Sequence, residues 1–211
     1  MGERLLLALR KIGTDALMWL YSHWDGDRMS FMMTVADILV EMHRENKKRF
    51  EDLLMLLLKK GFIVENEHSD RNYLAYISYA PAAGHMEILW VPLRYPEDAD
   101  ITRMLLWEQN VLTAFIGGVK TYVSPIAVAG SIKGNPLVDP KPIMRTWQLN
   151  FNEPTSVAEF VKETRDLLEE IVRLGKRDRT VYEVYRSYYE ALEKKIREYN
   201  EFLTEVITKS I

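Results

Sequence analysis

The side chains best suited to chemistry with a polyanion lie between positions 43 and 49. This basic cluster comprises His43, Arg44, Lys47, Lys48 and Arg49, with the polar Asn46 among them. Arginine and lysine contact phosphates, and arginine and asparagine also contact base edges. Cations at the start of a helix oppose its dipole and cost roughly a few tenths of a kcal/mol of stability each. This small cost indicates that the basic residues serve another purpose. The cluster therefore indicates DNA contact, and the solvated face of an ordinary helix is the alternative.

Two amphipathic helices are expected on either side of this cluster. The segment 34–43 carries Val35, Ile38, Leu39 and Met42 at helical spacing. Thr34 suits its N-cap, and Asp37 could complete a capping box. The segment 47–60 follows, with its buried face predicted at Phe50, Leu53, Leu54 and Leu57. Gly61 is expected to end this second helix.

The flanking segments predict further elements. Residues 62–64 and 73–77 are interpreted as a hairpin around a polar tip that contains Arg71, the one tip residue suited to a phosphate. Residues 3–24 are expected to be helical, with a break near Gly13, and residues 30–33 to form a short strand. The resulting order over residues 14–80 is helix, strand, helix, helix, strand, strand.

This order resembles the winged-helix superfamily found in MarR-like, PadR-like and ArsR-like regulators. The resemblance rests on the element order, on the step LLKKGFIVE and on the tyrosine-rich return strand. It implies a winged helix-turn-helix in which helix 47–60 reads double-stranded DNA. A fold alone does not settle a function.

The middle of the chain predicts a small α+β region. The segment 80–84 is the expected linker before it. Strands are predicted at 86–95 and 143–151, a helix at 101–115 that ends at Gly117 and Gly118, and a strand pair or a bent strand over 119–132. The loop 134–142 is expected to be irregular.

Two long helices are predicted at the C-terminal end. The first, 156–174, has Ser156 as its expected N-cap and Gly175 as its stop. The second, 180–207, carries apolar residues at intervals of three and four, as in a coiled coil. Its predicted dimerisation residues are Tyr188, Leu192, Ile196, Tyr199, Leu203 and Val206. The shorter helix would run out near Arg197, so the last turns are expected to need either the N-terminal segment or, as we predict, a second chain.

The fold expected from these elements is α+β with three regions. They are a winged-helix domain over 1–80, an α+β middle domain over 85–151 and a helical dimerisation region over 154–211.

Composition limits the possible functions. The 28 Lys and Arg and 31 Asp and Glu residues are spread evenly, so any nucleic-acid footprint must be local. The absence of cysteine excludes disulfides and fits a reducing cytoplasm, where we expect the protein. No apolar run is long enough to cross a membrane. Abundant Glu, Lys and Arg are typical of thermophiles.

Enzyme motifs and cofactor motifs are missing from the sequence. The four histidines are scattered, so no metal site is predicted, and there is no P-loop, dinucleotide fingerprint or nucleophile motif. We therefore expect no catalytic residues and no cofactor, with a nuclease as the remaining enzyme class. Glu97, Asp98 and Asp100 are interpreted as a solvated turn. The tryptophans Trp90, Trp107 and Trp147 suit core packing or, alternatively, an effector pocket.

The sequence thus favours a homodimeric DNA-binding transcriptional regulator. The alternative is a protein-interaction module that uses the acidic hairpin tip and the apolar half of helix 47–60. What separates the two is whether the basic cluster forms an exposed positive strip or is paired with acidic neighbours.

Overall fold

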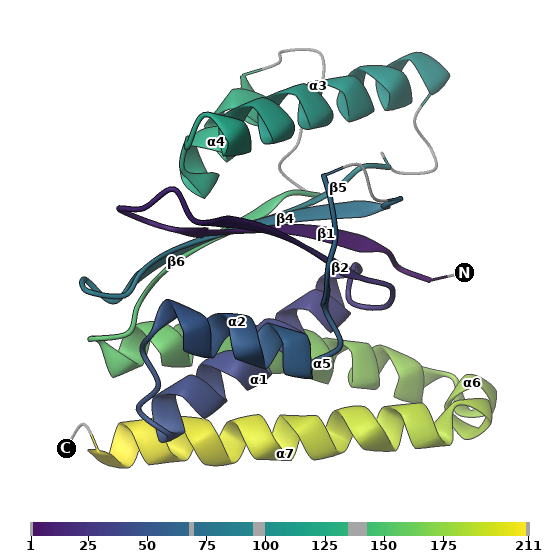
Figure 1. Cartoon of the computed structure of the whole chain (residues 1–211). Coiled ribbons are helices and arrows are strands. Elements are labelled where there is room, and N and C mark those ends of the chain that lie inside the picture. Colours follow the sequence, from purple (N-terminus) through teal and green to yellow (C-terminus); the bar gives the residue numbers. More distant parts are fainter. Residues whose placement is uncertain (1, 68–69, 95–99, 135–142, 210–211) are drawn as a thin grey trace.

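One six-stranded sheet runs through the middle of the molecule, and helices cover both of its faces (Figure 1). The computed structural model describes residues 2–67, 70–94, 100–134 and 143–209. The strand order is β3-β2-β1-β4-β5-β6; β1 pairs with β4 in parallel, and the other neighbours are antiparallel. The strands are β1 (Leu5–Lys11), β2 (Leu17–Ser22), β3 (Ile63–Val64), β4 (Tyr73–Ala80), β5 (His85–Pro92) and β6 (Arg145–Asn150).

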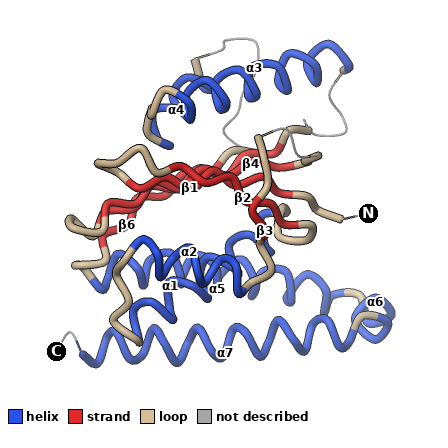
Figure 2. The backbone as a smooth tube through the Cα atoms, viewed as in Figure 1, coloured by secondary structure: helices blue, strands red, loops and turns tan. Residues whose placement is uncertain are grey.

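The helices form two layers of unequal thickness, as Figure 2 shows. One layer holds α3 (Ile101–Lys120) and α4 (Pro125–Lys133). The opposite layer holds α1 (Arg28–Arg44), α2 (Phe50–Lys59), α5 (Pro154–Arg177), α6 (Arg179–Val184) and α7 (Arg186–Lys209). The C-terminal end of α7 lies at the opposite side of the molecule from α6 (Figure 1).

Alternation along the central strands builds two cores. Leu5, Leu7 and Leu9 of β1 belong to the core under the thick layer, whereas Leu6 and Ala8 belong to the core under α3 and α4. Successive strand residues point to opposite faces, so a strand that is covered on both sides needs a continuous apolar run. The run from Leu5 to Leu9 meets this need, and all five residues are fully buried.

The prediction of helix over residues 3–24 is wrong, because this segment is the hairpin β1–β2. A continuous apolar run suits a doubly covered strand as well as a buried helix, so its periodicity alone does not separate the two. Gly13 has φ +82°, the left-handed conformation that glycine adopts readily, and it lies in the turn between the strands.

The predicted strand at 30–33 and the predicted cap at Thr34 are also wrong. Helix α1 already begins at Arg28, because the Asp27 side chain accepts a hydrogen bond from the Ser30 backbone N–H at 3.0 Å. Thr34 lies inside the helix and donates its hydroxyl to Asp25 at 2.8 Å. The expected helices 34–43 and 47–60 correspond to the second part of α1 and to α2.

The two strands predicted to form a wing do not pair with each other. β3 pairs with β2, while β4 lies between β1 and β5. The sheet therefore joins strands of the expected regions 1–80 and 85–151, and residues of α5 and α7 complete its larger core. Residues 68 and 69 of the expected tip lie outside the described part of the chain.

In the middle region the strands predicted at 86–95 and 143–151 are present as β5 and β6. Helix α3, however, continues through Gly117 and Gly118. A side chain at Gly118 would meet Val128, with the added carbon 2.5 Å from Val128 Cγ2, so this glycine lets α4 approach α3 closely. The strand pair predicted over 119–132 is wrong, since this segment is the end of α3 followed by α4. Asp100 caps α3, whereas Glu97, Asp98 and the loop 135–142 lie outside the described residues.

The C-terminal hairpin is present with different limits. Helix α5 starts at Pro154, and Ser156 accepts a hydrogen bond from the Asn150 backbone N–H instead of capping the helix. Gly175 does not end α5; it lies against Tyr189, whose ring leaves no room for a side chain there. The second helix is divided into α6 and α7, which meet at Tyr185. The fold is thus α+β, as predicted.

Candidate functional site

The basic cluster lies at the connection between α1 and α2, and most of its cations have acidic partners. Arg44 forms a two-pronged contact with Glu205 of α7, with N–O distances of 3.1 and 2.7 Å. Lys47 lies 2.6 Å from Glu45 and 3.5 Å from Glu41.

Arg49 and Lys48 are the more accessible members of the cluster. Arg49 pairs with Asp52 of the first turn of α2 at 3.1 Å, although its side chain remains 75% exposed. Lys48 is exposed and forms no ion pair with the described residues. The cluster is therefore largely neutralised within the chain and offers no continuous positive strip, which weakens the argument for DNA contact.

The other residues predicted for DNA contact have local structural partners. The His43 ring meets the Phe202 ring edge-on at 5.4 Å. Burial lowers the pKa of His43, and the nearby Lys209 acts in the same direction. Asn46 adopts φ 50° in the turn between the two helices. Arg71 is half-buried and donates to the Glu67 carbonyl at 3.0 Å, close to α3.

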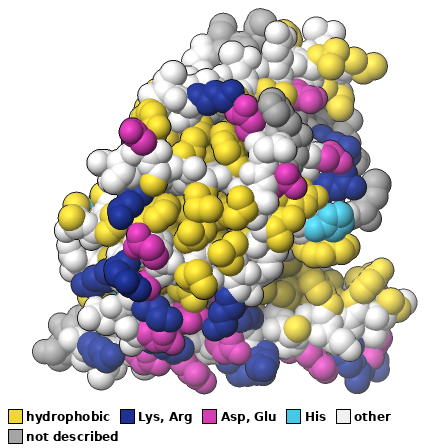
Figure 3. Space-filling view, in the orientation of Figure 1, with side chains coloured by type: hydrophobic (Ala, Val, Ile, Leu, Met, Phe, Trp, Pro, Cys, Tyr) yellow, Lys and Arg dark blue, Asp and Glu magenta, His cyan; other side chains and the backbone are white. Residues whose placement is uncertain are grey.

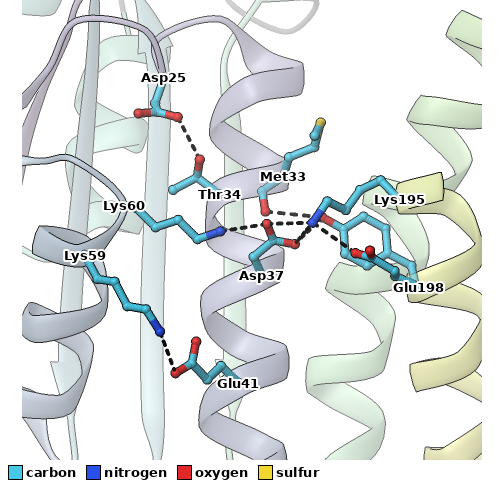
Figure 4. A network of polar contacts seen from close by, with 10 residues as sticks. Asp25, Met33, Thr34, Asp37, Glu41, Lys59, Lys60, Lys195 and Glu198 are labelled. Carbon is cyan, nitrogen blue, oxygen red and sulfur yellow. Dashed lines mark hydrogen bonds and ion pairs between the residues drawn. The ribbon is translucent and has the colours of Figure 1, made fainter. Parts of the chain in front are cut away.

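A partly buried carboxylate joins α1, α7 and the C-terminal end of α2 beside this cluster (Figure 4). Asp37 of α1 lies 2.9 Å from the Lys60 ammonium group and 3.1 Å from that of Lys195. The Tyr199 hydroxyl donates to Asp37 at 2.8 Å and also lies 3.2 Å from the Met33 carbonyl oxygen. Asp37 thus holds three helices together, whereas its sequence context suggested a local capping role.

The protonation states in this network suit a structural role. Burial raises the pKa of Tyr199, and the Asp37 carboxylate raises it further, so the hydroxyl stays a donor. Burial lowers the pKa of Lys195, but Asp37 and Glu198 outweigh this effect and leave that pKa above its ordinary value. Both groups therefore keep the protons they use to bind Asp37.

A groove of about 440 Å³ runs beside the network between α1 and α7. Its charged lining consists of four basic and five acidic side chains, including Glu41, Glu45 and Glu201. A nucleic acid would meet as much repulsion as attraction here, because phosphate binding depends on an excess of cations.

The residues predicted for dimerisation lie mostly inside the monomer. Leu192, Tyr199 and Val206 are no more than 3% exposed. Ile196 and Leu203 are half-buried against the same core, and Tyr188 is exposed. Their covering partners include α5 and α1 of the same chain, so the buried residues in the final turns of α7 pack within the chain, and contact of these turns with a second chain stays a prediction.

Other exposed apolar side chains lie on α2 and at the β3 edge of the sheet. Met55 of α2 is 62% exposed, and Ile63 and Val64 of β3 are 53% and 61% exposed. We call these three residues the α2–β3 surface. Hydrophobic side chains occupy the middle of this face of the molecule, between α3 above and α7 below (Figure 3).

One row of polar residues crosses the sheet on the side of α3 and α4. The strand register aligns Arg10, Ser78, Glu87 and Gln148 on four neighbouring strands. Gln148 donates to Glu87 at 3.3 Å, and the His85 ring nitrogen lies 3.9 Å from the same carboxylate. Ser78 is fully buried, and its hydroxyl has no hydrogen-bond partner among the described residues. A nucleophile needs a base within hydrogen-bond reach, so this row does not assemble a hydrolytic site.

The described residues contain no group of three or more His, Asp or Glu side chains that could hold a metal ion. The indole N–H groups of Trp90 and Trp107 donate to backbone carbonyls, and that of Trp147 donates to Glu163. All three rings are buried, which fits core packing. Within the described part of the chain no helix combines the length and the apolar character needed to span a membrane.

Comparison with known proteins adds no assignment. The chain matches no family model, and searches of curated proteins and of solved structures gave no match.

Proposed function

We propose that this protein is a protein-interaction module that binds an extended segment of a partner protein at the α2–β3 surface. The observation that carries the proposal is an apolar sheet edge left open to solvent at β3, the strand that follows α2 and its exposed Met55 in the chain. The proposal follows the interaction alternative for helix 47–60, with β3 as an additional part of the contact surface.

The backbone of β3 can accept another strand. The Glu65 N–H donates to the Trp19 carbonyl of β2 at 3.0 Å. Backbone groups alternate in direction along a strand, so the N–H and C=O of Val64 point away from β2. An added strand could exchange two hydrogen bonds with Val64, as in other cases of strand addition to a sheet edge.

The side chains around this edge supply the apolar contacts. Natural proteins usually protect sheet edges with charged side chains or proline. Both residues of β3 are instead apolar and more than half exposed, and Met55 can adapt to different contacting shapes because its side chain is unbranched. Ile63 and Val64 point to opposite faces of the sheet, so a partner segment with apolar residues on both of its faces would match this edge.

Selection from a displayed library of random peptides tests the proposal. We expect enriched peptides with short runs of consecutive apolar residues and affinities of roughly 1–100 μM. Replacing Val64 by proline removes the outward N–H without breaking a bond to β2, and should weaken binding about tenfold.

The matched control is Val64→Thr, which keeps the N–H and a strand-forming side chain. Met55→Glu should also weaken binding, because it places a charge against the apolar partner. If no peptide class is enriched, or if the proline variant binds as well as the native chain, strand addition at β3 is refuted.

DNA binding by a homodimeric regulator remains a second proposal. It is supported by the exposure of Lys48 and Arg49 at the start of α2, where a helix can meet phosphates. Fluorescence anisotropy with random-sequence duplexes across salt concentrations tests it. A DNA affinity that decreases as the salt concentration rises, and that is lost in the Lys48→Ala, Arg49→Ala double variant, would support DNA contact. An affinity that does not change with salt concentration would exclude it.

A further inference from the structure

The turn from α6 into α7 exposes a second apolar surface. Helix α6 has no buried residue, yet it carries Val181 and Val184, which are 39% and 70% exposed. Tyr185 and Tyr188 continue this surface and are 58% and 44% exposed. We call these four residues the α6–α7 corner. Hydrophobic side chains are also visible in the lower right part of Figure 3, where α6 lies.

The four residues are spaced to form one stripe. Their positions follow the i, i+3, i+4, i+7 pattern of one helix face. The chain changes direction at Tyr185, but helical hydrogen bonds cross the junction, from the Tyr185 N–H to the Val181 carbonyl and from the Tyr189 N–H to the Tyr185 carbonyl, both at 3.1 Å. The stripe therefore stays continuous from α6 into the first turn of α7, where Tyr188 is partly covered by α1 because its hydroxyl donates to Met29 Sδ at 3.4 Å.

Charged residues border the stripe in a self-complementary order. Arg179 precedes it and Glu190 follows it, and both are exposed without an ion pair to the described residues. Between them, Glu183 and Arg186 form an ion pair within the chain. Arg179 and Glu190 lie equally far along the sequence from the junction between Val184 and Tyr185. Glu183 and Arg186 are also equally far from it, so each basic residue corresponds to an acidic one.

We propose that the α6–α7 corner is the contact surface of a homodimer, with a two-fold axis between Val184 and Tyr185. In such a dimer α6 of one copy lies against the start of α7 of the other. Val184 meets Tyr185 of the second copy, and Val181 meets Tyr188 of the second copy. A two-fold axis makes every such contact occur twice.

The same axis places unlike charges together. Arg179 meets Glu190 of the second copy, so each unpaired charge finds a partner. Glu183 and Arg186 meet their counterparts in the same way. In this register apolar residues meet apolar residues, and basic residues meet acidic ones. We therefore choose a second copy of this chain as the partner of the α6–α7 corner.

A membrane surface fits this corner less well. Peripheral helices that bind anionic lipids carry an excess of lysine and arginine on their polar face. Here Asp178, Glu183 and Glu190 accompany the basic residues Arg179 and Arg186. The mixed charge favours a protein surface with its own mixed charge.

Charge exchange tests the proposal on the full chain. Sedimentation velocity should show that the native chain is dimeric at about 10 μM. Arg179→Glu and Glu190→Arg should each weaken association about tenfold, because each places two pairs of like charges across the axis. The double variant restores both pairs in reversed order and should recover the dimer.

Mixing the two single variants provides the sharpest result. One variant then carries two acidic residues at these positions and the other carries two basic residues, so native mass spectrometry should detect the heterodimer in preference to either homodimer. Val184→Asp should give a monomer with an unchanged circular dichroism spectrum. Lys133→Glu, a charge reversal at an exposed residue of α4, is the matched control and should leave the dimer intact.

Three outcomes would overturn the proposal. They are a native chain that stays monomeric, a double variant that does not recover the dimer, and a Val184→Asp variant that still dimerises. If the native chain is monomeric but sediments with vesicles that contain phosphatidylserine, the corner binds a membrane surface instead.

Discussion

The two ends of α7 use similar residue types in opposite ways. Near its C-terminal end Tyr199, Phe202 and Val206 are at most 3% exposed, and they pack against α1 and α5. At its start Tyr185 and Tyr188 are exposed, although they continue the same pattern of apolar spacing. A stripe of apolar residues therefore shows that a helix needs a covering partner, but it does not show whether that partner belongs to the same chain.

The difference between the two ends comes from α1. This helix lies along the second half of α7, where the ring of Phe202 meets His43 and the hydroxyl of Tyr199 reaches Asp37. Before Tyr185 the chain turns into α6, where no residue is buried. The buried end of α7 should therefore control folding of the monomer, and the exposed end should control association.

The largest expected difference between the two ends concerns aromatic truncation. Phe202→Ala should lower the free energy of unfolding by about 3–4 kcal/mol, because it leaves a cavity between α1 and α7. Tyr185→Ala should change it by less than about 0.5 kcal/mol, since this ring is mostly in solvent. Urea denaturation at low protein concentration, where the chain is monomeric, measures both values. Similar losses for the two variants would contradict the assignment of separate roles.

The second expected difference concerns carboxylates. Asp37→Ala removes the acceptor of Tyr199 and the counter-ion of Lys60 and Lys195. Removing one partner of a fully buried charge network costs several kcal/mol, but these lysines are partly solvated, so we expect a loss of about 2 kcal/mol.

The matched control for Asp37 is Glu190→Ala at the other end of α7. This carboxylate is exposed and unpaired within the described chain, so the monomer should lose less than about 0.5 kcal/mol. Thermal unfolding of both variants at low concentration provides the measurement. A stability loss from Glu190→Ala as large as that from Asp37→Ala would show that the two ends are not distinct.

Elements that depend on local sequence patterns were predicted more accurately than features that depend on contacts between distant parts of the chain. Helix α2 and the strands β5 and β6 were predicted close to their positions, because their patterns are local. The run Leu5–Leu9 was assigned to a helix, since a strand buried on both faces has no alternation to reveal it. The role of Asp37 could not be predicted, because its partner Lys195 lies 158 residues further along the chain.

The candidate surfaces show the same limit. The residues of β3 were expected in a wing hairpin, since the local sequence contains two strands around a polar tip. Their true neighbour is β2, which was itself predicted as helix, so one error led to the other. The basic cluster was expected in the first turns of helix 47–60, but it lies at the end of α1 and in the connection before α2, and the pairing of Arg44 with Glu205 depends on the distant α7.

The smallest expected effect is a pH dependence that belongs to the buried end of α7 alone. Burial lowers the pKa of His43 in the folded chain, with Lys209, Arg44 and Lys48 acting in the same direction and Glu205 opposing them. The unfolded chain therefore binds a proton more readily as the pH falls through the ordinary histidine value of about 6.5. The contribution of His43 to the free energy of unfolding is therefore fully present above about pH 6.5 and decreases below it.

The variant His43→Gln should reduce this loss between about pH 7.5 and pH 5, by well under 1 kcal/mol because the ring is only partly buried. Glu205 adds to the acid sensitivity of the native chain, since its hydrogen bond to Arg44 lowers its pKa and the bond weakens on protonation at lower pH. Because the pKa of Glu205 lies below its ordinary value of 4.5, its contribution is lost only below about pH 4.5, and the double variant His43→Gln, Glu205→Gln should show a flatter profile than His43→Gln only there. Urea denaturation from about pH 7.5 to about pH 3.5 is the measurement, with His23→Gln as the control because that side chain is exposed and lies against Gly2. An equal change for His23→Gln would show that the acid sensitivity does not arise at the contact between α1 and α7.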